Sequence, residues 1–510
     1  MSSSPDDGAA PTLLPAPPAP LVSRHGRQTP LLIAIGIAVL TAVLYSLLGW
    51  RQWATLTVPS WDLGIFSQLA SAYAGLEAPI VSIKGHGFNL LGDHFHPILV
   101  ALGPIWALWP SGLSLLITQA VLFGISAIPL TRLAVERWGV PMGTMLGLAY
   151  GLGWGLQSAA TSQFHEIAFA VPILAFGLAA YLRGRIPAAA LWIALLVFVK
   201  EDLGLTVAAF GAILALRPGG PDHRGTDNRG ANGSSAVGDE RGRGGGANGS
   251  SAVGKARGLA RLDRRTIGWA LVAWGLVWLA LATFVILPAL NPAGQYDYTD
   301  RLGSPLDIFV PWTKYATVLM LAATAGFVGL RSPLILMMLP TLAWRFVGTV
   351  EHYWGWQWHY SATLVPIALA ALLDAAPRRE LHRWLAVAAT VAVTLVLGPR
   401  LPLATLLAPE TWQDSERMPY AREAIAAVRE GAFVETDITL MAYLAPHAEP
   451  YWMGNANPPP EFVLFNLESY VFGGSPPADA AEWAERKHPG TTYEVVYTGG
   501  GFSVAERADG

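Results

Sequence analysis

Apolar runs that suit membrane crossing recur along this chain, and they constrain its fold more than any other feature. A helix needs about 20 mostly apolar residues to span the hydrocarbon core of a bilayer. Residues 31–50 form the first such run. Further runs follow at 112–133, 140–157, 167–182, 186–199, 203–216, 267–290, 315–330, 333–349, 361–374 and 384–404. The sequence therefore predicts an all-α polytopic membrane protein with about 11 transmembrane helices.

The composition agrees with this class and excludes others. Hydrophobic residues make up 53% of the 510 residues and charged residues only 14%, whereas soluble domains carry about 25% charged residues. The net charge of -3 gives no basic field, so no nucleic-acid partner is expected. The chain has no cysteine, which excludes disulfides, thiolate catalysis and cysteine-ligated metals.

Basic residues determine the predicted orientation, because cytoplasmic loops of membrane proteins are rich in Lys and Arg. Arg24 and Arg27 precede the first run and no A-x-A-like cleavage site follows it, which predicts a retained first span with a cytoplasmic N-terminus. The threading then puts the C-terminus outside and the remaining short basic loops inside. Their basic residues are Arg132, Arg137, Arg183, Arg185, Arg331, Arg378, Arg379 and Arg383. The expected location is therefore the plasma membrane, with multiple passes.

Three segments differ from the membrane domain, which we predict over residues 30–404. Residues 1–29 are rich in Pro, Ala and Ser and should be a disordered cytoplasmic tail. Residues 217–265 carry ANGSSAVG twice among Gly, Ser, Asn and Arg, which predicts a disordered cytoplasmic linker. Residues 405–510 have mixed polar and apolar composition and should form a small extracytoplasmic α/β domain.

Local patterns predict the elements of this last domain. Residues 417–430 and 478–487 have helical periodicity, and 433–438 and 461–467 read as short buried strands. The strands at 492–497 and 502–505 flank a Gly-rich turn like a hairpin.

Polar and ionisable residues collect in the predicted outer loops. Such residues are costly inside a bilayer, so their positions point to function. Eight of the 11 histidines lie in or beside these loops or in the outer domain. The candidate site residues are Asp62, Asp93, His94, His96, His165, Glu166, Lys200, Glu201, Asp202, Arg345, His352, Trp356, Trp358 and His359. Together they predict a polar cavity that opens to the outside.

Each candidate also has a structural interpretation. A carboxylate such as Asp62, just after the first span, can cap a helix. Asp93, His94 and His96 suit either a metal site or a hydrogen-bonded cluster, so a divalent metal stays open and no other cofactor is predicted. Arg345 can extend toward the interface, where its charge reaches water. The aromatic residues of 353–360 suit an interfacial belt or a sugar-stacking surface equally.

Several motifs resemble a known family. WDLGIFSQ at 61–68, LGDHFHPILVALGPIWALWP at 91–110 and SLLITQAVLFGISAIPLTRLAVER at 114–137 resemble the bacterial membrane-protein family called domain of unknown function 2079. FHEIAFAVP, VKEDLGL and WQWHYSATLVP further along the chain resemble it too. That family is similar in layout to the GT-C superfamily of membrane glycosyltransferases, many of which use a polyprenyl-phosphate sugar on the outer face.

The resemblance implies roles for individual residues. Asp62 matches the first-loop catalytic acid of the GT-C pattern, and His165 and Glu166 match a second outer loop where some members place another acid. His94 and His96 match the juxtamembrane segment, and Lys200 or Arg345 would be the partner of the lipid phosphate. The first loop has no Asp-x-Asp, which departs from the metal-dependent members.

We therefore expect a glycosyltransferase that transfers a sugar, with inversion, from a polyprenyl-phosphate donor to a cell-envelope acceptor on the outer face. Asp62 would be the base, and the partners would be a lipid-linked sugar, membrane lipids and a glycan, lipid or protein acceptor. The same polar residues also fit a transporter or flippase of lipid-linked sugars, or a non-catalytic envelope protein.

Overall fold

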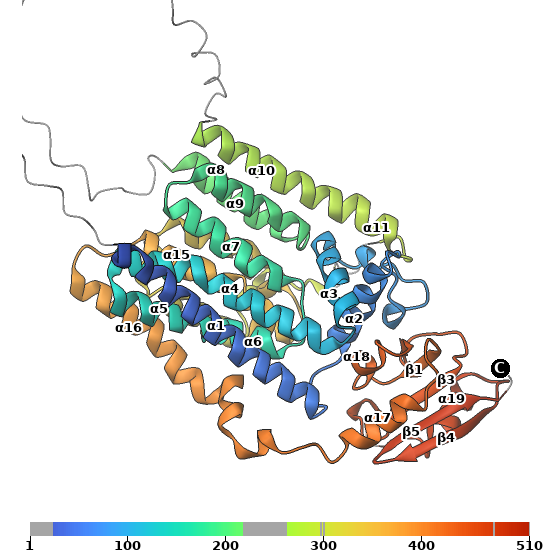
Figure 1. The fold of residues 1–510 in the computed structure, drawn as a ribbon. Helices are drawn as coiled ribbons and strands as arrows, with labels where there is room; N and C mark the ends of the chain where they lie inside the picture. The colour runs from blue at the N-terminus through green and yellow to red at the C-terminus, as the bar shows by residue number, and fades with distance from the viewer. Residues whose placement is uncertain (1–23, 218–262, 296–297, 299–300, 473–474, 509–510) are drawn as a thin grey trace, which may run out of the picture.

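The computed structural model describes residues 24–217, 263–295, 298, 301–472 and 475–508, most of them in helices that run side by side as a bundle (Figure 1). Among these described residues, four helices are long and apolar enough to cross a membrane: Gln28–Ala54, Gly112–Trp138, Arg264–Leu290 and Glu380–Arg400. Shorter apolar helices span Pro97–Leu108, Ile167–Leu182, Ile186–Phe198, Leu203–Leu216, Pro333–Val347 and Leu364–Asp374. The number of crossings, and the side on which each loop lies, stay predictions.

The helices of the bundle follow the predicted apolar runs with a few differences. They are α1 (Arg24–Ala54), α4 (Gly112–Trp138), α5 (Val140–Gly151), α6 (Trp154–Thr161), α7 (Ile167–Leu182), α8 (Ile186–Ala194), α9 (Leu203–Leu216), α10 (Arg264–Leu281), α11 (Leu287–Leu290), α12 (Thr313–Thr324), α13 (Leu339–Val347), α15 (Leu364–Asp374) and α16 (Glu380–Leu397). The predicted bounds of α7 and α9 are confirmed. The run 140–157 is instead two helices, because the chain leaves helical geometry at Leu152 and Gly153.

The predicted tail and linker lie largely outside the described residues. The exceptions are the start of α1 at Arg24, inside the predicted tail, and both ends of the predicted linker, where Arg217 pairs with Asp374 and α10 begins at Arg264. An existing helix extends at little cost, since each added residue completes one more backbone hydrogen bond.

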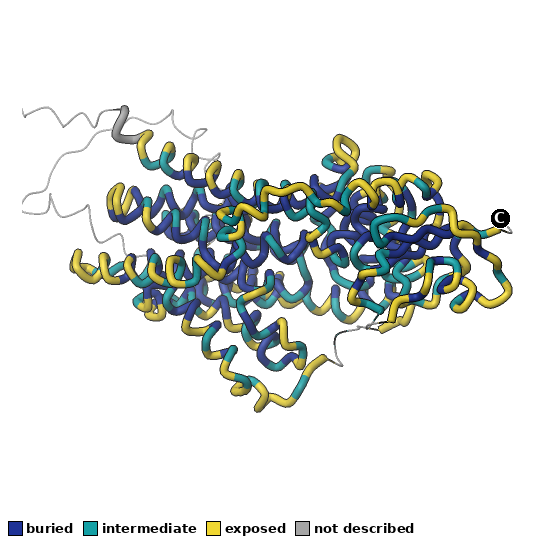
Figure 2. The backbone as a smooth tube through the Cα atoms, turned by 90° about the horizontal axis from the view of Figure 1, so that it is seen from below, coloured by how far each residue is buried: buried dark blue, intermediate teal, exposed yellow. Residues whose placement is uncertain are grey.

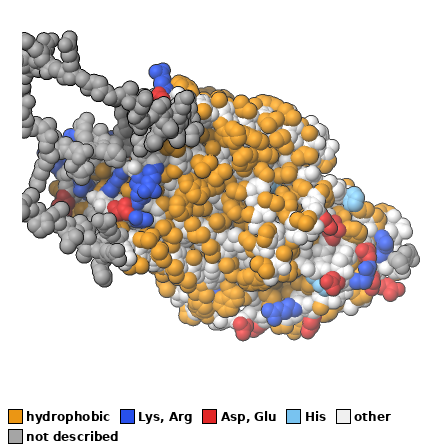
Figure 3. Space-filling view, turned by 45° about the horizontal axis from the view of Figure 1, so that its top comes forward, with side chains coloured by type: hydrophobic (Ala, Val, Ile, Leu, Met, Phe, Trp, Pro, Cys, Tyr) orange, Lys and Arg blue, Asp and Glu red, His pale blue; other side chains and the backbone are white. Residues whose placement is uncertain are grey.

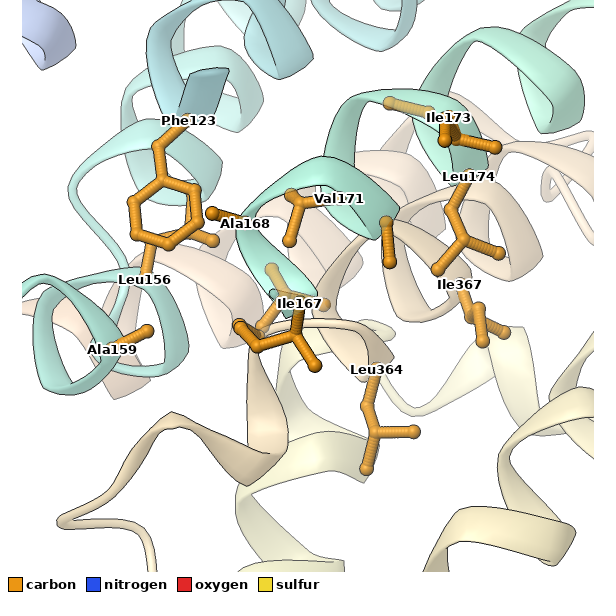
Figure 4. Packing of buried hydrophobic residues seen from close by; sticks show 14 of the residues in the cluster. Phe123, Leu156, Ala159, Ile167, Ala168, Val171, Ile173, Leu174, Leu364 and Ile367 are labelled. Carbon is orange, nitrogen blue, oxygen red and sulfur yellow. The ribbon is translucent and has the colours of Figure 1, made fainter. Parts of the chain in front are cut away.

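Helix α7 lies at the centre of the bundle and is apolar all round, as a fully buried helix requires. Figure 4 shows Ile167, Val171 and Leu174 of α7 among side chains of α4, α6 and α15. In Figure 2 the interior of the bundle is buried while its periphery is exposed. The peripheral helix α10 exposes large apolar residues such as Val277, and Figure 3 shows such side chains covering the middle of one face, with charges toward both ends. Lipid would cover this surface.

Helices α9 and α10 pack closely because small residues face each other between them. A Cβ atom on Gly211 would lie 2.6 Å from the carbonyl oxygen of Gly268, which is too close for any side chain. Small residues at such crossings let backbones approach in a membrane environment.

One end of the bundle, which we call the Asp374 end, is held by arginines and carboxylates. Arg217 Nη1 donates to both carboxylate oxygens of Asp374, at 3.0 and 2.8 Å, and Ser332 Oγ donates to Asp374 at 2.6 Å. Arg183 pairs with Glu136, 2.5 Å away. These contacts connect the ends of α4, α7, α9 and α15.

The opposite end, which we call the Asp62 end, carries short elements between the bundle helices. Its helices are α2 (Trp61–Ala74), α3 (Leu102–Leu108) and α14 (Glu351–Trp354). Single turns lie at Ser82–Lys84, Leu90–Gly92, Pro97–Ala101, Leu195–Phe198 and His359–Ser361. The segments that contain the candidate site residues therefore meet at one end of the bundle.

The C-terminal residues form a five-stranded sheet in the order β2-β1-β3-β5-β4. Its strands are β1 (Phe433–Thr436), β2 (Glu449–Trp452), β3 (Phe462–Asn466), β4 (Tyr493–Gly499) and β5 (Phe502–Arg507). The first three are parallel, and β5 pairs antiparallel with β3 and β4. Helix α17 (Met418–Ala426) packs on one face and α19 (Ala480–Lys487) on the other.

Most elements of this domain are confirmed as predicted, including both helices and the hairpin. Strand β2 and the short helix α18 (Met441–Leu444) were not predicted. Strand β2 has four residues, one of them Pro450, so it lacks the apolar alternation that marks a strand.

Candidate active site

Asp62 lies in the first turn of α2 at the Asp62 end of the bundle. Its Oδ2 atom is 3.3 Å from His165 Nε2 and accepts a hydrogen bond from Gln163 Nε2, also at 3.3 Å. The same Gln163 accepts the backbone N–H of Leu63 through Oε1 at 3.0 Å. One third of the Asp62 side chain is exposed, so this carboxylate is fixed in place yet reachable from solvent.

His165 lies in the turn between α6 and α7 and is buried. Its backbone N–H donates to Gln119 Oε1 at 3.2 Å, and its ring stacks on His359 with 3.5 Å between centroids. The Nδ1 atoms of His165 and His359 are buried, and no described residue offers either of them a hydrogen bond. Asp62 is therefore backed by two stacked histidines that retain unused hydrogen-bonding capacity.

Glu166 and Lys200 form a buried ion pair beside this group. Lys200 Nζ donates to Glu166 Oε1 at 2.8 Å, and only 3% of the Glu166 side chain is exposed. Burial raises the pKa of Glu166, but Lys200, His94 and His165 outweigh burial and hold it below its usual range. Glu166 is therefore a carboxylate at neutral pH.

Glu201 holds the segment of the first loop that precedes α3. Its Oε1 atom lies 2.8 Å from His94 Nδ1, and its Oε2 atom accepts the Phe95 N–H at 3.0 Å. The His94 ring stacks on Tyr298 at 4.5 Å. Burial lowers the pKa of His94 and Lys200 lowers it further, but Glu201 and Asp93 outweigh both and raise it.

Asp93 continues the network toward the surface. It lies 3.1 Å from Lys84 Nζ and accepts the hydroxyl of Tyr298 at 3.0 Å. Burial raises the pKa of Asp93, but His94 and Lys84 overcome this effect and lower it. Charges thus alternate in sign along the connected groups of the Asp62 end.

His96 is buried and Asp202 is partly buried, and each has one buried atom without a partner. These atoms, His96 Nδ1 and Asp202 Oδ1, receive no hydrogen bond from the described residues. Burial lowers the pKa of His96 to about 4, so its ring is neutral at pH 7. Burial raises the pKa of Asp202 to about 6, although Lys200 opposes this shift.

The residues do not fit a metal ion. Asp93 and His94, two of the three suggested ligands, are directed to Lys84 and Glu201. Among the described residues, no group of three or more His, Asp and Glu side chains is arranged to hold a metal. We therefore derive no chemical step through a metal.

Arg345 supports the aromatic loop. Its guanidinium, fully buried, donates to the carbonyls of Tyr353 at 2.7 Å, Gly355 at 3.0 Å and Tyr360 at 3.4 Å, and to Ser361 Oγ at 3.2 Å. Four hydrogen bonds leave little capacity for a ligand. Arg345 thereby fixes the loop that presents His359 to His165.

The remaining aromatic candidates, His352, Trp356 and Trp358, have their recorded ring and core contacts with residues other than Asp62. His352 is exposed and contacts the partly exposed Trp358, with 5.2 Å between ring centroids, while Trp356 packs against the core. The structure thus joins Asp62, His165, Glu166, Lys200 and His359 and places the other loop residues around them.

Four residues of the site were not singled out from the sequence: Gln119, Gln163, Lys84 and Tyr298. Gln163 and Gln119 are uncharged and lie beside or inside apolar helices, where a glutamine has no pattern of its own. Gln119 Nε2 donates to the carbonyl of Gln163 at 2.8 Å, so the two amides hold the turn that carries His165. Only the fold brings Lys84 and Tyr298 to Asp93.

These features define a helical membrane protein with a small C-terminal α/β domain and a buried ionic network at one end of its bundle. Residues 52–510 match the family described as predicted membrane protein (DUF2079), and the chain belongs to this family, as its motifs suggested. No curated protein matches the chain. Among solved structures, ArnT from Cupriavidus metallidurans bound to undecaprenyl phosphate is similar, with 13% identity, a TM-score of 0.48, and coverage of 92% of this chain and 97% of that chain.

Proposed function

We propose that this chain is a membrane glycosyltransferase that transfers a sugar, with inversion, from a polyprenyl-phosphate donor to an acceptor of the cell envelope. The observation that carries the proposal is the Asp62–His165 pair: a partly exposed carboxylate, 3.3 Å from a buried histidine, at the start of a helix. In the proposal the Asp62 end faces outward and the Asp374 end faces the cytoplasm, because the short basic loops gather at the latter.

Asp62 acts as the general base. Its carboxylate takes the proton of an acceptor hydroxyl while the hydroxyl oxygen attacks the anomeric carbon of the donor. The bond from that carbon to the phosphate oxygen breaks, and the phosphate leaves with the bonding electrons. Gln163 and His165 hold Asp62 in position, and the stacked His359 limits the movement of His165.

The leaving phosphate needs a positive group where its charge develops. We assign this role to Lys200. Among the described residues its ammonium donates one hydrogen bond, to Glu166, and an ammonium has three N–H donors. Arg345, the second candidate from the sequence, is instead a positioning residue, since its hydrogen bonds are occupied within the aromatic loop.

The distribution of charge favours an enzyme over a transporter. A pathway through the membrane needs polar groups along its whole length. Helices α7 and α9, and α4 up to Thr131, contain no Asp, Glu, Lys, Arg or His. In the neighbouring α15, the one such residue is Asp374 at its end. The charged groups are instead divided between the two ends of the bundle.

The test uses purified full-length protein in nanodiscs with a panel of polyprenyl-phosphate sugars. We expect wild type to release free polyprenyl phosphate from at least one donor, and Asp62→Asn to reduce this rate by about 100-fold to 10,000-fold. Glu77→Gln, which changes an exposed carboxylate of the same loop, is the matched control and should retain the wild-type rate. Tight binding of a lipid-linked sugar without release of polyprenyl phosphate would contradict the proposal and favour transport.

A further inference from the structure

The C-terminal domain is fixed directly to the helix that carries Asp62. A Cβ atom on Gly64 of α2 would lie 2.7 Å from Met441 Cβ of α18, so the two helices touch where only a glycine fits. One residue further along, the Ala442 N–H donates to Ser60 Oγ at 2.6 Å, just before α2 begins. The domain and the start of α2 therefore form one rigid contact.

Further contacts surround this one on both sides. Tyr443 stacks on Trp53 with 4.1 Å between centroids and donates its hydroxyl to the Trp53 carbonyl at 3.1 Å. On the other side, Gln68 Nε2 donates to the carbonyl of Pro450 in β2 at 2.9 Å. Strand β2 is thereby held along α2, and its last residue contacts the start of that helix.

That last residue, Trp452, meets Trp61, the neighbour of Asp62 in sequence. The two indole rings are 4.7 Å apart at an interplanar angle of 82°. Both side chains are partly exposed, and among the described residues no hydrogen bond is recorded from either indole N–H. Asn457 Nδ2 holds the backbone of Trp452 by donating to its carbonyl at 2.8 Å.

This pair has the chemistry of a carbohydrate-binding surface. An indole offers an apolar face for the C–H groups of a pyranose ring and an N–H donor for a sugar hydroxyl. Within the described part of the chain neither indole N–H has a protein acceptor, and the two rings pack against each other. A lipid acceptor would instead be expected against the exposed apolar side chains of the bundle, away from this contact between two domains.

We infer that Trp61 and Trp452 form the acceptor subsite of the enzyme and that the acceptor is a carbohydrate. The inference rests on the proposed function, because Asp62 would deprotonate the sugar hydroxyl that this pair presents. The C-terminal domain thus completes the active site through one side chain, Trp452, and it selects the class of acceptor.

The kinetic test compares Trp452→Ala, Trp452→Phe and wild type, each full-length in nanodiscs, with a donor that wild type consumes and a set of soluble oligosaccharide acceptors. We expect Trp452→Ala to raise the acceptor KM by about tenfold, more than it lowers kcat. Trp452→Phe should recover most of the loss because it restores an aromatic face. Tyr470→Ala, an exposed aromatic of the same domain, should behave as wild type. An unchanged acceptor KM in Trp452→Ala would overturn the inference.

A binding experiment separates this inference from the proposed reaction. Saturation-transfer NMR with tetrasaccharides of hexose, N-acetylhexosamine and pentose needs no donor turnover. We expect a signal for at least one of these probes with wild type and its loss in Trp452→Ala, even if no donor is ever consumed. A signal that persists in Trp452→Ala, or no signal from any probe with wild type, would overturn the carbohydrate subsite. Absence of donor turnover alone would overturn only the proposed function.

Discussion

The two ends of the helical bundle both concentrate charge, but they use it differently. At the Asp374 end, Arg217, Asp374 and Ser332 satisfy one another, and Arg183 pairs with Glu136. At the Asp62 end, carboxylates meet histidines and a lysine, and buried atoms of His96, His165, Asp202 and His359 find no hydrogen-bond partner among the described residues.

In our proposal this difference separates a structural role from a chemical one. The Asp374 side chain is only 2% exposed and accepts hydrogen bonds from Arg217 and Ser332, so it is closed to a ligand and holds helix ends together. Buried polar atoms without partners cost free energy, and at the Asp62 end they lie beside the carboxylate that we propose as the base. Under the proposed function, the Asp374 end contributes fold stability and the Asp62 end carries the chemistry.

The largest effect is expected at the Lys200–Glu166 pair, which tests whether the two ends of the bundle differ in role. Lys200→Met should lower activity per folded molecule by more than about 100-fold, if Lys200 faces the leaving phosphate. It should also destabilise the protein, by roughly 3–5 kcal/mol, because Glu166 is left buried and unpaired. The double variant Lys200→Met/Glu166→Gln should regain stability in thermal unfolding but remain inactive. Recovery of activity in the double variant would make this pair structural, like those at the other end.

The Asp374 end should respond in the opposite way. Asp374→Asn removes the anionic partner of Arg217 and should cost about 1–3 kcal/mol of stability, less than for a fully buried pair, because the Arg217 side chain is 25% exposed. Activity per folded molecule should stay near wild type, measured as donor turnover at a temperature where the variant is folded. A large loss of turnover with unchanged stability would show that the two ends are not distinct in role.

A smaller effect is expected from His96, and it depends on pH. Burial lowers the pKa of His96 from 6.5 to about 4 in the folded state. Unfolded His96 takes up a proton as the pH falls through 6.5, whereas folded His96 stays neutral until about pH 4. Stability that is present above pH 6.5 is therefore lost as the pH falls toward 4, by about 3 kcal/mol at most.

The measurement for His96 is the thermal unfolding of wild type and His96→Gln between pH 7 and pH 4. The variant should show a flatter dependence than wild type over this interval. His382→Gln, which changes an exposed histidine, should follow the wild-type curve. Identical slopes for wild type and His96→Gln would contradict the buried, neutral state of His96.

The sequence predicts the helices of this protein better than it predicts the site. Helix α7 matches its predicted bounds because a fully buried helix is a continuous apolar run with clear ends. The break between α5 and α6 escapes the sequence, since hydrophobicity continues through Leu152 and Gly153. In the C-terminal domain, β2 escapes because it is short and contains Pro450.

The site shows a similar division. Charged residues in apolar surroundings, such as Lys200 and Glu166, are visible from the sequence because their burial would be costly. Their pairing is visible only in the fold, because 34 residues separate them. The contacts of Gln163 with Asp62 and of Trp452 with Trp61 join positions that no local pattern relates.

The most direct test of the account is a paired measurement on Asp62→Asn and Asp374→Asn. For each variant we would determine the melting temperature and the rate of polyprenyl-phosphate release per folded molecule, in the same nanodiscs. We predict that Asp62→Asn melts close to wild type but releases at least about 100-fold less product, while Asp374→Asn melts lower but turns over normally. If Asp62→Asn kept near-normal release, or if both variants lost only stability, the assignment of chemistry to the Asp62 end would be wrong.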